Sequence, residues 1–278
     1  MSVNNSSENP AFLGKVFGVM DGLQDEDNTS TSPAIDCQNP AGVPVSLDNL
    51  HTLLPAVAGK KVVDLCCGDG WFSRWATEQG AAAVQAYDGS ESMVQQAIQK
   101  TQGTENSHKI TFEHADLNDD ETALDLAYFG VEEGKTYDLA FSCLGLHYLK
   151  DLPEIFEVIY DMVAPNGSFF FSIEHPMRTA PKHPGLVKIH DNVAEVSWPV
   201  ANYREEGERM VNCMGEEVIK QHRTLEAYFN GVVKAGFQVI FLREWGCKRQ
   251  NLKDIREQRW MKAEDIIPAF VMIGARKV

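Results

Sequence analysis

Cysteines are few, and their spacing excludes the frameworks that cysteines usually build. The six cysteines of the 278-residue chain lie at positions 37, 66, 67, 143, 213 and 247. None of them forms a C-x-x-C pair, so neither a disulfide scaffold nor a zinc site is expected, and we predict no bound metal. Such cysteine usage is typical of a reducing compartment.

Long apolar runs are also missing. No stretch approaches the ~18 consecutive apolar residues that a membrane-spanning helix needs. The first ten residues are polar and contain neither a basic region nor an apolar one, so no secretory signal is expected. The sequence therefore predicts a cytoplasmic protein with no membrane partner.

Basic residues are scarce beside acidic ones. The chain has 25 Lys and Arg against 40 Asp and Glu, a formal net charge of -15. A surface of that sign repels phosphate backbones, so we expect no nucleic-acid partner unless the fold gathers a local basic patch. With 44% hydrophobic and 23% charged residues, the composition is that of an ordinary globular protein.

The chain divides into a polar N-terminal segment and a folded domain. Residues 1–45 are rich in Asn, Ser, Asp and Pro, which predicts a mobile segment, and their one apolar patch, Phe12 to Met20, is a candidate lid helix. Residues 46–278 form the predicted domain. Within it, residues 176–218 show no clean period, and a segment of that length inside a compact domain is usually a lid or a substrate cap.

Elsewhere in the domain, short apolar runs alternate with amphipathic segments. The runs predict strands at 62–66, 83–87, 109–113, 137–143, 168–173, 237–242 and 268–275. The amphipathic segments predict helices at 71–79, 91–100, 151–163 and 225–235. This alternation predicts an α/β fold with a doubly wound, mainly parallel, seven-stranded sheet and a cap insertion after the fifth strand.

A glycine-rich turn follows the first predicted strand. Residues 62–70 read VVDLCCGDG, and such a turn lets the backbone approach a ligand at the carboxyl edge of the sheet. Asp88 ends the second predicted strand, 18 residues beyond Gly70, and is placed to bind ribose hydroxyls. The G-x-G-x-x-G motif of dehydrogenases would need a third glycine where Ser73 stands, so a nicotinamide enzyme is not expected.

Over residues 58–175 the sequence resembles the class I, Rossmann-like methyltransferases that use S-adenosylmethionine. This family carries an acid-x-Gly-x-Gly-x-Gly turn, and Asp64, Gly68 and Gly70 match its acid and its last two glycines. Cys66 stands where the first glycine is expected, which places a bulkier side chain near the methionine end of the cofactor. The resemblance implies that Asp64 and the turn hold the amino-acid end of S-adenosylmethionine.

Further positions carry the same resemblance. It implies that Asp88 holds the ribose and that the pair Asp116–Leu117 lies beside the adenine. The run from Asp138 to Tyr148 resembles the fourth strand and the loop that borders the reacting centre. From these positions the implied cofactor site also includes Gly89, Met93, Ser142 and Cys143. The expected product of the cofactor is S-adenosylhomocysteine.

Catalysis by such a protein consists mainly of positioning the nucleophile and, where needed, removing its proton. A base should follow the carboxyl ends of the fourth and fifth strands, where His147 and the pair Glu174–His175 lie. A histidine pKa near 6.5 suits proton transfer at neutral pH. These three residues are the candidate catalytic groups, and His147 is preferred. Their structural alternatives are packing of the loop by His147, pocket lining by His175 and loop orientation by Glu174.

The acceptor is expected to be a small molecule. The loop Ser142-Cys143-Leu144-Gly145 lacks the Pro-Pro-aromatic signature of enzymes that methylate DNA adenine or release-factor glutamine. Trp198, Tyr203 and His222 are the candidate substrate-binding residues, although aromatic side chains also fill cores. We therefore expect methyl transfer to a nitrogen or oxygen of a small molecule. A protein or RNA methyltransferase and a non-methylating, cofactor-binding member of the fold are the alternatives, and the oligomeric state is open.

Overall fold

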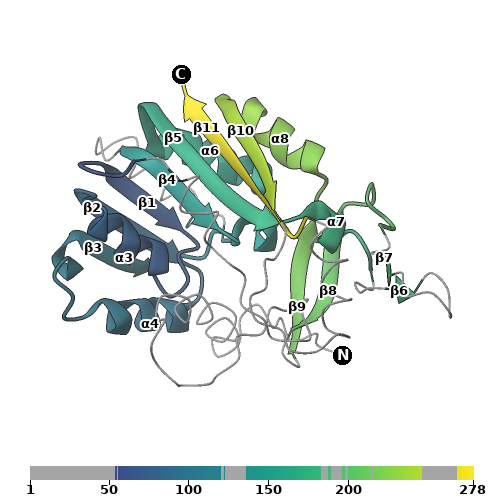
Figure 1. Ribbon diagram of the computed structural model, residues 1–278, viewed down its shortest axis with the longest axis horizontal. Helices are drawn as coiled ribbons and strands as arrows, with labels where there is room; N and C mark the ends of the chain where they lie inside the picture. Colours follow the sequence, from purple (N-terminus) through teal and green to yellow (C-terminus); the bar gives the residue numbers. More distant parts are fainter. Residues whose placement is uncertain are drawn as a thin grey trace.

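The computed structural model describes residues 54, 56–119, 122, 136–182, 187–188, 196–197, 200–213, 216–245 and 268–278 (Figure 1). The expected N-terminal lid and the candidate residue Trp198 lie outside these ranges. Among the described parts, no helix is long and apolar enough to cross a membrane.

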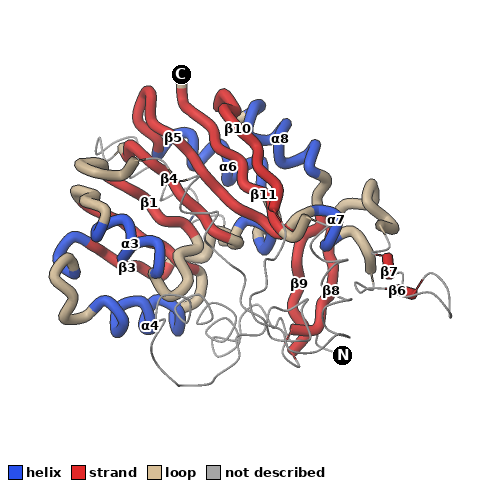
Figure 2. Tube along the Cα trace, in the orientation of Figure 1, coloured by secondary structure: helices blue, strands red, loops and turns tan. Residues whose placement is uncertain are grey.

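One seven-stranded sheet organises the molecule (Figures 1 and 2). Its strands are β1 (Lys61–Leu65), β2 (Ala83–Asp88), β3 (Ile110–His114), β4 (Tyr137–Cys143), β5 (Val163–Glu174), β10 (Phe237–Trp245) and β11 (Phe270–Lys277). They lie in the order β10-β11-β5-β4-β1-β2-β3, and only β11 runs antiparallel to its neighbours. The predicted sheet is thus confirmed. Chain order reverses between β1 and β4, and sheets of this type bind ligands at the carboxyl ends of such strands.

Helices cover both faces of the sheet. They are α3 (Trp71–Glu78), α4 (Glu91–Thr101), α6 (Leu152–Met162) and α8 (Leu225–Lys234). In one core, Phe72 of α3 stacks on Phe141 of β4 with ring centroids 3.6 Å apart, while Phe156 of α6 packs against Phe171 in the core on the opposite face. Burying each such ring contributes roughly 1.5–3 kcal/mol to folding. Each predicted helix lies within a residue or two of its observed bounds.

Pro165, Asn166 and Gly167 are residues typical of a turn, but they do not interrupt the fifth strand. β5 begins at Val163 rather than at the expected Ser168, and its register against β4 shifts between Tyr137 and Leu139. Asn166 takes a φ of 64°, so the turn residues form an irregularity inside one longer strand. The expected start of the strand at Ser168 was therefore wrong, because pairing with β4 is found on both sides of the irregularity.

The segment between β5 and α8, which we call the cap, contains the elements that are inserted after the fifth strand. It contains α7 (Pro176–Thr179), the short pair β6 (Val187–Lys188) and β7 (Val196–Ser197), and a hairpin of β8 (Gly207–Cys213) and β9 (Glu216–His222). The hairpin and α7 lie side by side near the end of β5 (Figures 1 and 2). Arg209 of β8 joins them, since its Nε donates to the Ala180 carbonyl at 3.1 Å.

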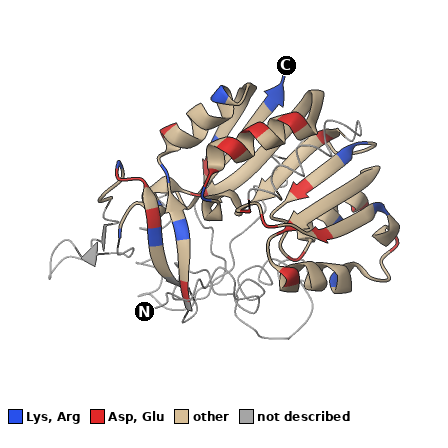
Figure 3. Cartoon of the chain, turned by 180° about the vertical axis from the view of Figure 1, so that it is seen from behind, with Lys and Arg blue, Asp and Glu red and all other residues tan. Residues whose placement is uncertain are grey.

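Charge is distributed unevenly over the fold. Figure 3 shows acidic residues along α6, where Glu154, Glu157 and Asp161 are exposed. Figure 3 also shows basic residues on the β8–β9 hairpin, but Arg209 and Lys220 there are buried. Positive charge therefore lies inside the cap of a chain whose net charge is -15.

Candidate active site

The glycine-rich turn connects β1 to α3 in left-handed backbone. Cys66, Gly68 and Gly70 have φ values of 55°, 58° and 80°. The N–H of Gly68 donates to Asp88 Oδ2 at 2.8 Å. A Cβ on Gly70 would lie 2.7 Å from the Phe112 ring, so a side chain there would also collide with β3. The turn is thus fastened to the carboxyl end of β2.

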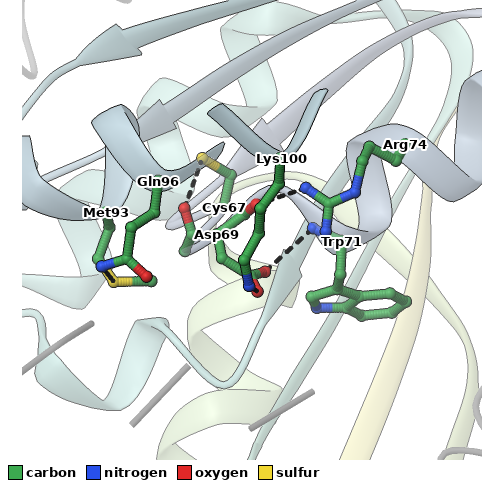
Figure 4. A network of polar contacts seen from close by, with 8 residues as sticks. Cys67, Asp69, Trp71, Arg74, Met93, Gln96 and Lys100 are labelled. Atoms are coloured by element: carbon green, nitrogen blue, oxygen red, sulfur yellow. Dashed lines mark hydrogen bonds and ion pairs between the residues drawn. The ribbon is translucent and has the colours of Figure 1, made fainter. Parts of the chain in front are cut away.

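Asp69 holds the same turn to the helices beside it (Figure 4). This fully buried carboxylate accepts from Lys100 Nζ of α4 at 2.7 Å and from the Trp71 N–H at 3.2 Å. The backbone carbonyl of Asp69 accepts from Arg74 Nη1 at 2.6 Å. Because Lys100 lies at the end of α4, these contacts tie the turn to two successive helices.

Asp64 lies buried within β1. Its Oδ2 accepts from the Ser73 hydroxyl of α3 at 2.6 Å. Burial raises the pKa of Asp64 to about 7, and the Ser73 hydrogen bond offsets only part of this effect. The carboxylate predicted to hold the amino-acid end of the cofactor is therefore directed at α3, where it supports the turn.

Asp88 and Asp116 come together at the ends of β2 and β3. Asp88 Oδ1 accepts from the Ser90 N–H at 2.9 Å, and burial raises the pKa of Asp88 to about 6. A Cβ on Gly89 would lie 3.4 Å from Asp116 Oδ1, which places these two residues in contact. Asp116 is exposed, its neighbour Leu117 is buried, and Met93 is fully buried on α4.

The loop after β4 packs directly against the turn. A Cβ on Gly145 would lie 2.2 Å from Cys66 Cβ and 2.7 Å from Cys66 Sγ, so the Cys66 side chain occupies the space that Gly145 leaves. Ser142 is fully buried, and Cys143 Sγ accepts from the Ser172 hydroxyl at 3.2 Å. Cys66 and Ser142 therefore both lie beside Gly145, whereas Cys143 contacts Ser172 in the core on the opposite face of the sheet.

His147 lies on the short 3-10 helix η4 (Leu146–Tyr148) and is 3% exposed. No described residue hydrogen-bonds its Nδ1. Burial, reinforced by the positive charges of Lys220 and Arg223, holds the pKa of His147 well below its usual range. The imidazole is therefore uncharged at neutral pH and keeps a ring nitrogen that no described residue bonds.

His175 uses both of its ring nitrogens within the protein. Its Nδ1 accepts from the Met177 N–H at 3.1 Å, which caps α7. The proton therefore lies on Nε2, which donates to Glu244 Oε1 at 2.7 Å. Burial lowers the pKa of His175, although Glu244 opposes the shift. This histidine fastens the cap to β10.

Glu174 is paired with Lys220, a residue that the sequence reasoning missed. Lys220 Nζ of β9 donates to Glu174 Oε2 at 2.8 Å, and both side chains are almost completely buried. The same ammonium lies 5.8 Å from the centre of the Tyr148 ring. The sequence signal that could have indicated the burial of Lys220 is its spacing, since Val218, Lys220 and His222 are alternate residues that share the buried face of β9.

Tyr203 and His222 make contacts inside the cap. The Tyr203 hydroxyl accepts from the Leu225 N–H at 3.1 Å, at the start of α8. The Tyr203 carbonyl accepts from His222 Nε2 at 3.0 Å, so His222 Nδ1 is left to accept from the Thr179 hydroxyl at 2.7 Å. These two predicted substrate residues are therefore close together, and their hydrogen bonds connect the cap to α7 and to the start of α8.

Comparison with known proteins agrees with this geometry. The family model of the methyltransferase domain matches residues 44–206. A Haemophilus influenzae protein of uncharacterized function is 30% identical over 247 residues, which cover 84% of this chain and 90% of the relative.

Two solved structures are similar over most of their length. The S-adenosylmethionine-dependent methyltransferase from Mesorhizobium loti is 32% identical, with a TM-score of 0.67 and coverage of 83% of this chain and 96% of that one. A candidate S-adenosylmethionine-dependent methyltransferase from Listeria monocytogenes is 29% identical, with a TM-score of 0.66 and coverage of 84% and 97%. Sheet order, glycine-rich turn and family match agree, and the chain is a member of the class I S-adenosylmethionine-dependent methyltransferase family.

Proposed function

We propose that the cofactor lies against the glycine-rich turn, with Asp88 at its ribose, Asp116 and Leu117 at its adenine, and Cys66, Ser142 and Cys143 near its sulfur. The residues present fit this cofactor. Asp64 and Asp88 are buried carboxylates, and neither forms an ion pair with a described lysine or arginine. Buried negative charge of this kind favours the sulfonium and ammonium groups of a cationic cofactor.

Cofactor affinity should increase as the pH rises through about 6. Asp88 has a pKa of about 6 in the free protein, and it must be ionised to accept strongly from ribose hydroxyls. Below that pH a proton must leave when the cofactor binds, so affinity should fall by up to about tenfold per pH unit. Calorimetric titration at several pH values measures this, and Asp88→Asn should remove most of the dependence.

The ligand-free protein should show the opposite trend in stability. Its Asp88 pKa is raised from 3.8, so the contribution of this group to stability is fully present below 3.8 and is lost as the pH rises through about 6. The difference in unfolding free energy between the wild type and Asp88→Asn isolates this contribution. An equal pH dependence in both proteins would contradict the assignment.

We further propose that the acceptor is a small molecule methylated on nitrogen or oxygen. The observation that carries this proposal is the enclosure of the polar side chains at the ends of β4 and β5. His147, Glu174, His175 and Lys220 are each no more than 6% exposed beside the cap. A nucleic acid would need an open, basic surface, whereas the net charge of this chain is -15. A cytoplasmic location accords with the free thiols of Cys66, Cys67 and Cys143.

Among the candidate bases, His147 is the group that we assign to proton removal. Both ring nitrogens of His175 are bonded within the protein, and Glu174 is paired with Lys220. His147 alone of the three keeps an uncharged ring with a nitrogen that no described residue bonds. The bound cofactor supplies an activated methyl group, and the protein orients the acceptor and takes its proton.

Transfer of labelled methyl groups tests the acceptor class. A cell extract is first divided by ultrafiltration into small molecules, which pass the filter, and protein and RNA, which the filter retains. Each fraction is then incubated with the protein and with cofactor that is labelled in its methyl group. We expect protein-dependent label in a small molecule of the ultrafiltrate, and much less label with Asp88→Ala when the cofactor is kept below saturation. Label in retained protein or RNA would instead support a macromolecular acceptor, and cofactor binding without any transfer would support a non-methylating role.

A further inference from the structure

We propose that Lys220 is a positioning residue for His147: held by Glu174, it places its ammonium beside the Tyr148–His147 pair, where its positive charge disfavours a proton on the imidazole. This inference rests on the proposed function, in which His147 takes the proton of the acceptor. If Lys220 acts in this way, the cap hairpin has a second role besides covering the site, because the ionisation of His147 then depends on the position of β9 against the sheet.

The position of Lys220 is built from contacts on both sides. In the hairpin register Lys220 lies directly opposite Arg209, and like charges in that arrangement repel. Arg209 Nε and Nη1 donate to the backbone carbonyls of Ala180 and Glu208. Lys220 instead crosses to the sheet and pairs with Glu174 at the end of β5. The ammonium is thus fixed at the junction of cap and sheet.

This junction includes the ring of His147. The Tyr148 ring lies under the Lys220 ammonium at 5.8 Å, and its centroid is 4.5 Å from that of His147. Lys220, Tyr148 and His147 therefore form a continuous series from β9 to η4. The ring at its end has a buried Nδ1 with no described partner. A buried polar atom in that condition is costly unless a bound molecule satisfies it.

Charged and titratable groups reach this region from every element packed around η4. From β9 and the residue after it come Lys220 and Arg223, and from β5 comes Glu174, which is already paired. From α8 comes Tyr228, which is hydrogen-bonded to Arg223 and whose pKa burial raises to about 12, so it is neutral. Arg223 Nη2 donates to the Leu149 carbonyl at 2.6 Å. Two cations against one carboxylate disfavour a charged imidazole.

An uncharged imidazole is what the transfer step needs. The acceptor nitrogen or oxygen forms a bond to the methyl carbon, while the carbon–sulfur bond breaks and leaves its electron pair on sulfur. The proton of the acceptor passes to the free nitrogen of His147 and then to water. A histidine that was already protonated could not accept it. Holding His147 neutral therefore keeps the base ready at pH values where a solvated histidine would be partly charged.

Nuclear magnetic resonance of the full, ligand-free chain tests this directly. Long-range proton–nitrogen correlations report the ionisation of each histidine, and His147→Gln identifies the signals of His147. In the wild type we expect His147 to stay neutral well below the pH at which a solvated histidine becomes charged. In Lys220→Met the titration midpoint of His147 should rise by at least about one pH unit. Lys220→Arg keeps the positive charge, so its His147 should titrate like that of the wild type.

Two further variants guard against a purely structural explanation. Lys182→Met removes an exposed lysine of the same cap, which pairs with Glu205 at 3.3 Å, and should leave the His147 midpoint unchanged. The double variant Glu174→Gln/Lys220→Met removes both buried charges, so it keeps a neutral junction if Lys220→Met alone fails to fold. It should raise the midpoint by less than Lys220→Met does, because loss of the Glu174 carboxylate, which favours a charged ring, offsets part of the loss of the cation.

An unchanged His147 midpoint in the folded Lys220 variants would overturn the inference, as would a wild-type midpoint near 6.5. Calorimetric titration with S-adenosylmethionine separates this result from the proposed function. If the wild type binds the cofactor and the midpoint does not move, Lys220 is only a structural residue. If the wild type does not bind the cofactor, the proposed function fails, whatever the histidine titration shows.

Discussion

Asp88→Ala should weaken S-adenosylmethionine binding by roughly ten- to a hundredfold while the protein stays folded. The substitution removes the carboxylate expected to accept from two ribose hydroxyls, a loss of about 1.5–3 kcal/mol. It also frees the N–H groups of Gly68 and Ser90, which the carboxylate now holds. The glycine-rich turn should therefore lose part of its fixed shape together with its ribose contact.

Calorimetric titration of the folded variant measures this loss. Asp119→Ala is a matched control, because Asp119 is an exposed acid beyond β3 that bonds Thr122. Its affinity should equal that of the wild type. The affinity of Asp88→Asn should lie between those of Asp88→Ala and the wild type, since an amide oxygen still accepts from one partner. Equal affinity in Asp88→Ala and the wild type would remove Asp88 from the cofactor site.

The central strands of the sheet were predictable because they are buried on both faces. Runs such as Leu139–Phe141 are then apolar throughout, and the periodic helices between the strands have a different pattern. The turn residues were equally visible, since left-handed backbone favours glycine at 68 and 70. Both features follow from local chemistry, which a single sequence contains in full.

The cap was less predictable because several of its inward side chains are polar. Arg209, Lys220 and His222 are buried in the hairpin beside Val211 and Val218, so hydrophobic alternation marks β8 and β9 only weakly. Their burial depends on partners far away in sequence, such as Glu174 for Lys220. The roles of His175 and Lys220 likewise depend on long-range contacts, and no local pattern could have distinguished a bonded histidine from one with a free nitrogen.

Gly145→Ala should be among the most damaging single-methyl changes in the chain. The added Cβ would lie 2.2 Å from Cys66 Cβ, and both atoms belong to tightly packed backbone turns rather than to flexible side-chain ends. Overpacking of this kind costs about 1–3 kcal/mol or more. The loop after β4 or the glycine-rich turn must move, so cofactor affinity should fall together with stability. Urea unfolding and calorimetric titration measure the two effects.

The partner of this clash is Cys66, so its removal should rescue the variant. Cys66→Gly/Gly145→Ala should regain most of the lost stability, because the alanine methyl then enters the space that the thiol side chain leaves. Glycine also removes the cost of about 1 kcal/mol for a side chain in left-handed backbone, which Cys66 adopts at a φ of 55°.

Cys66→Ala/Gly145→Ala is the matched control, since alanine keeps the colliding Cβ and should not rescue. If both double variants behave alike, or the effects of Cys66→Gly and Gly145→Ala simply add, the two positions are not coupled. Cys66 would then be a tolerated replacement of the first glycine, and the missing side chain of Gly145 would need another cause.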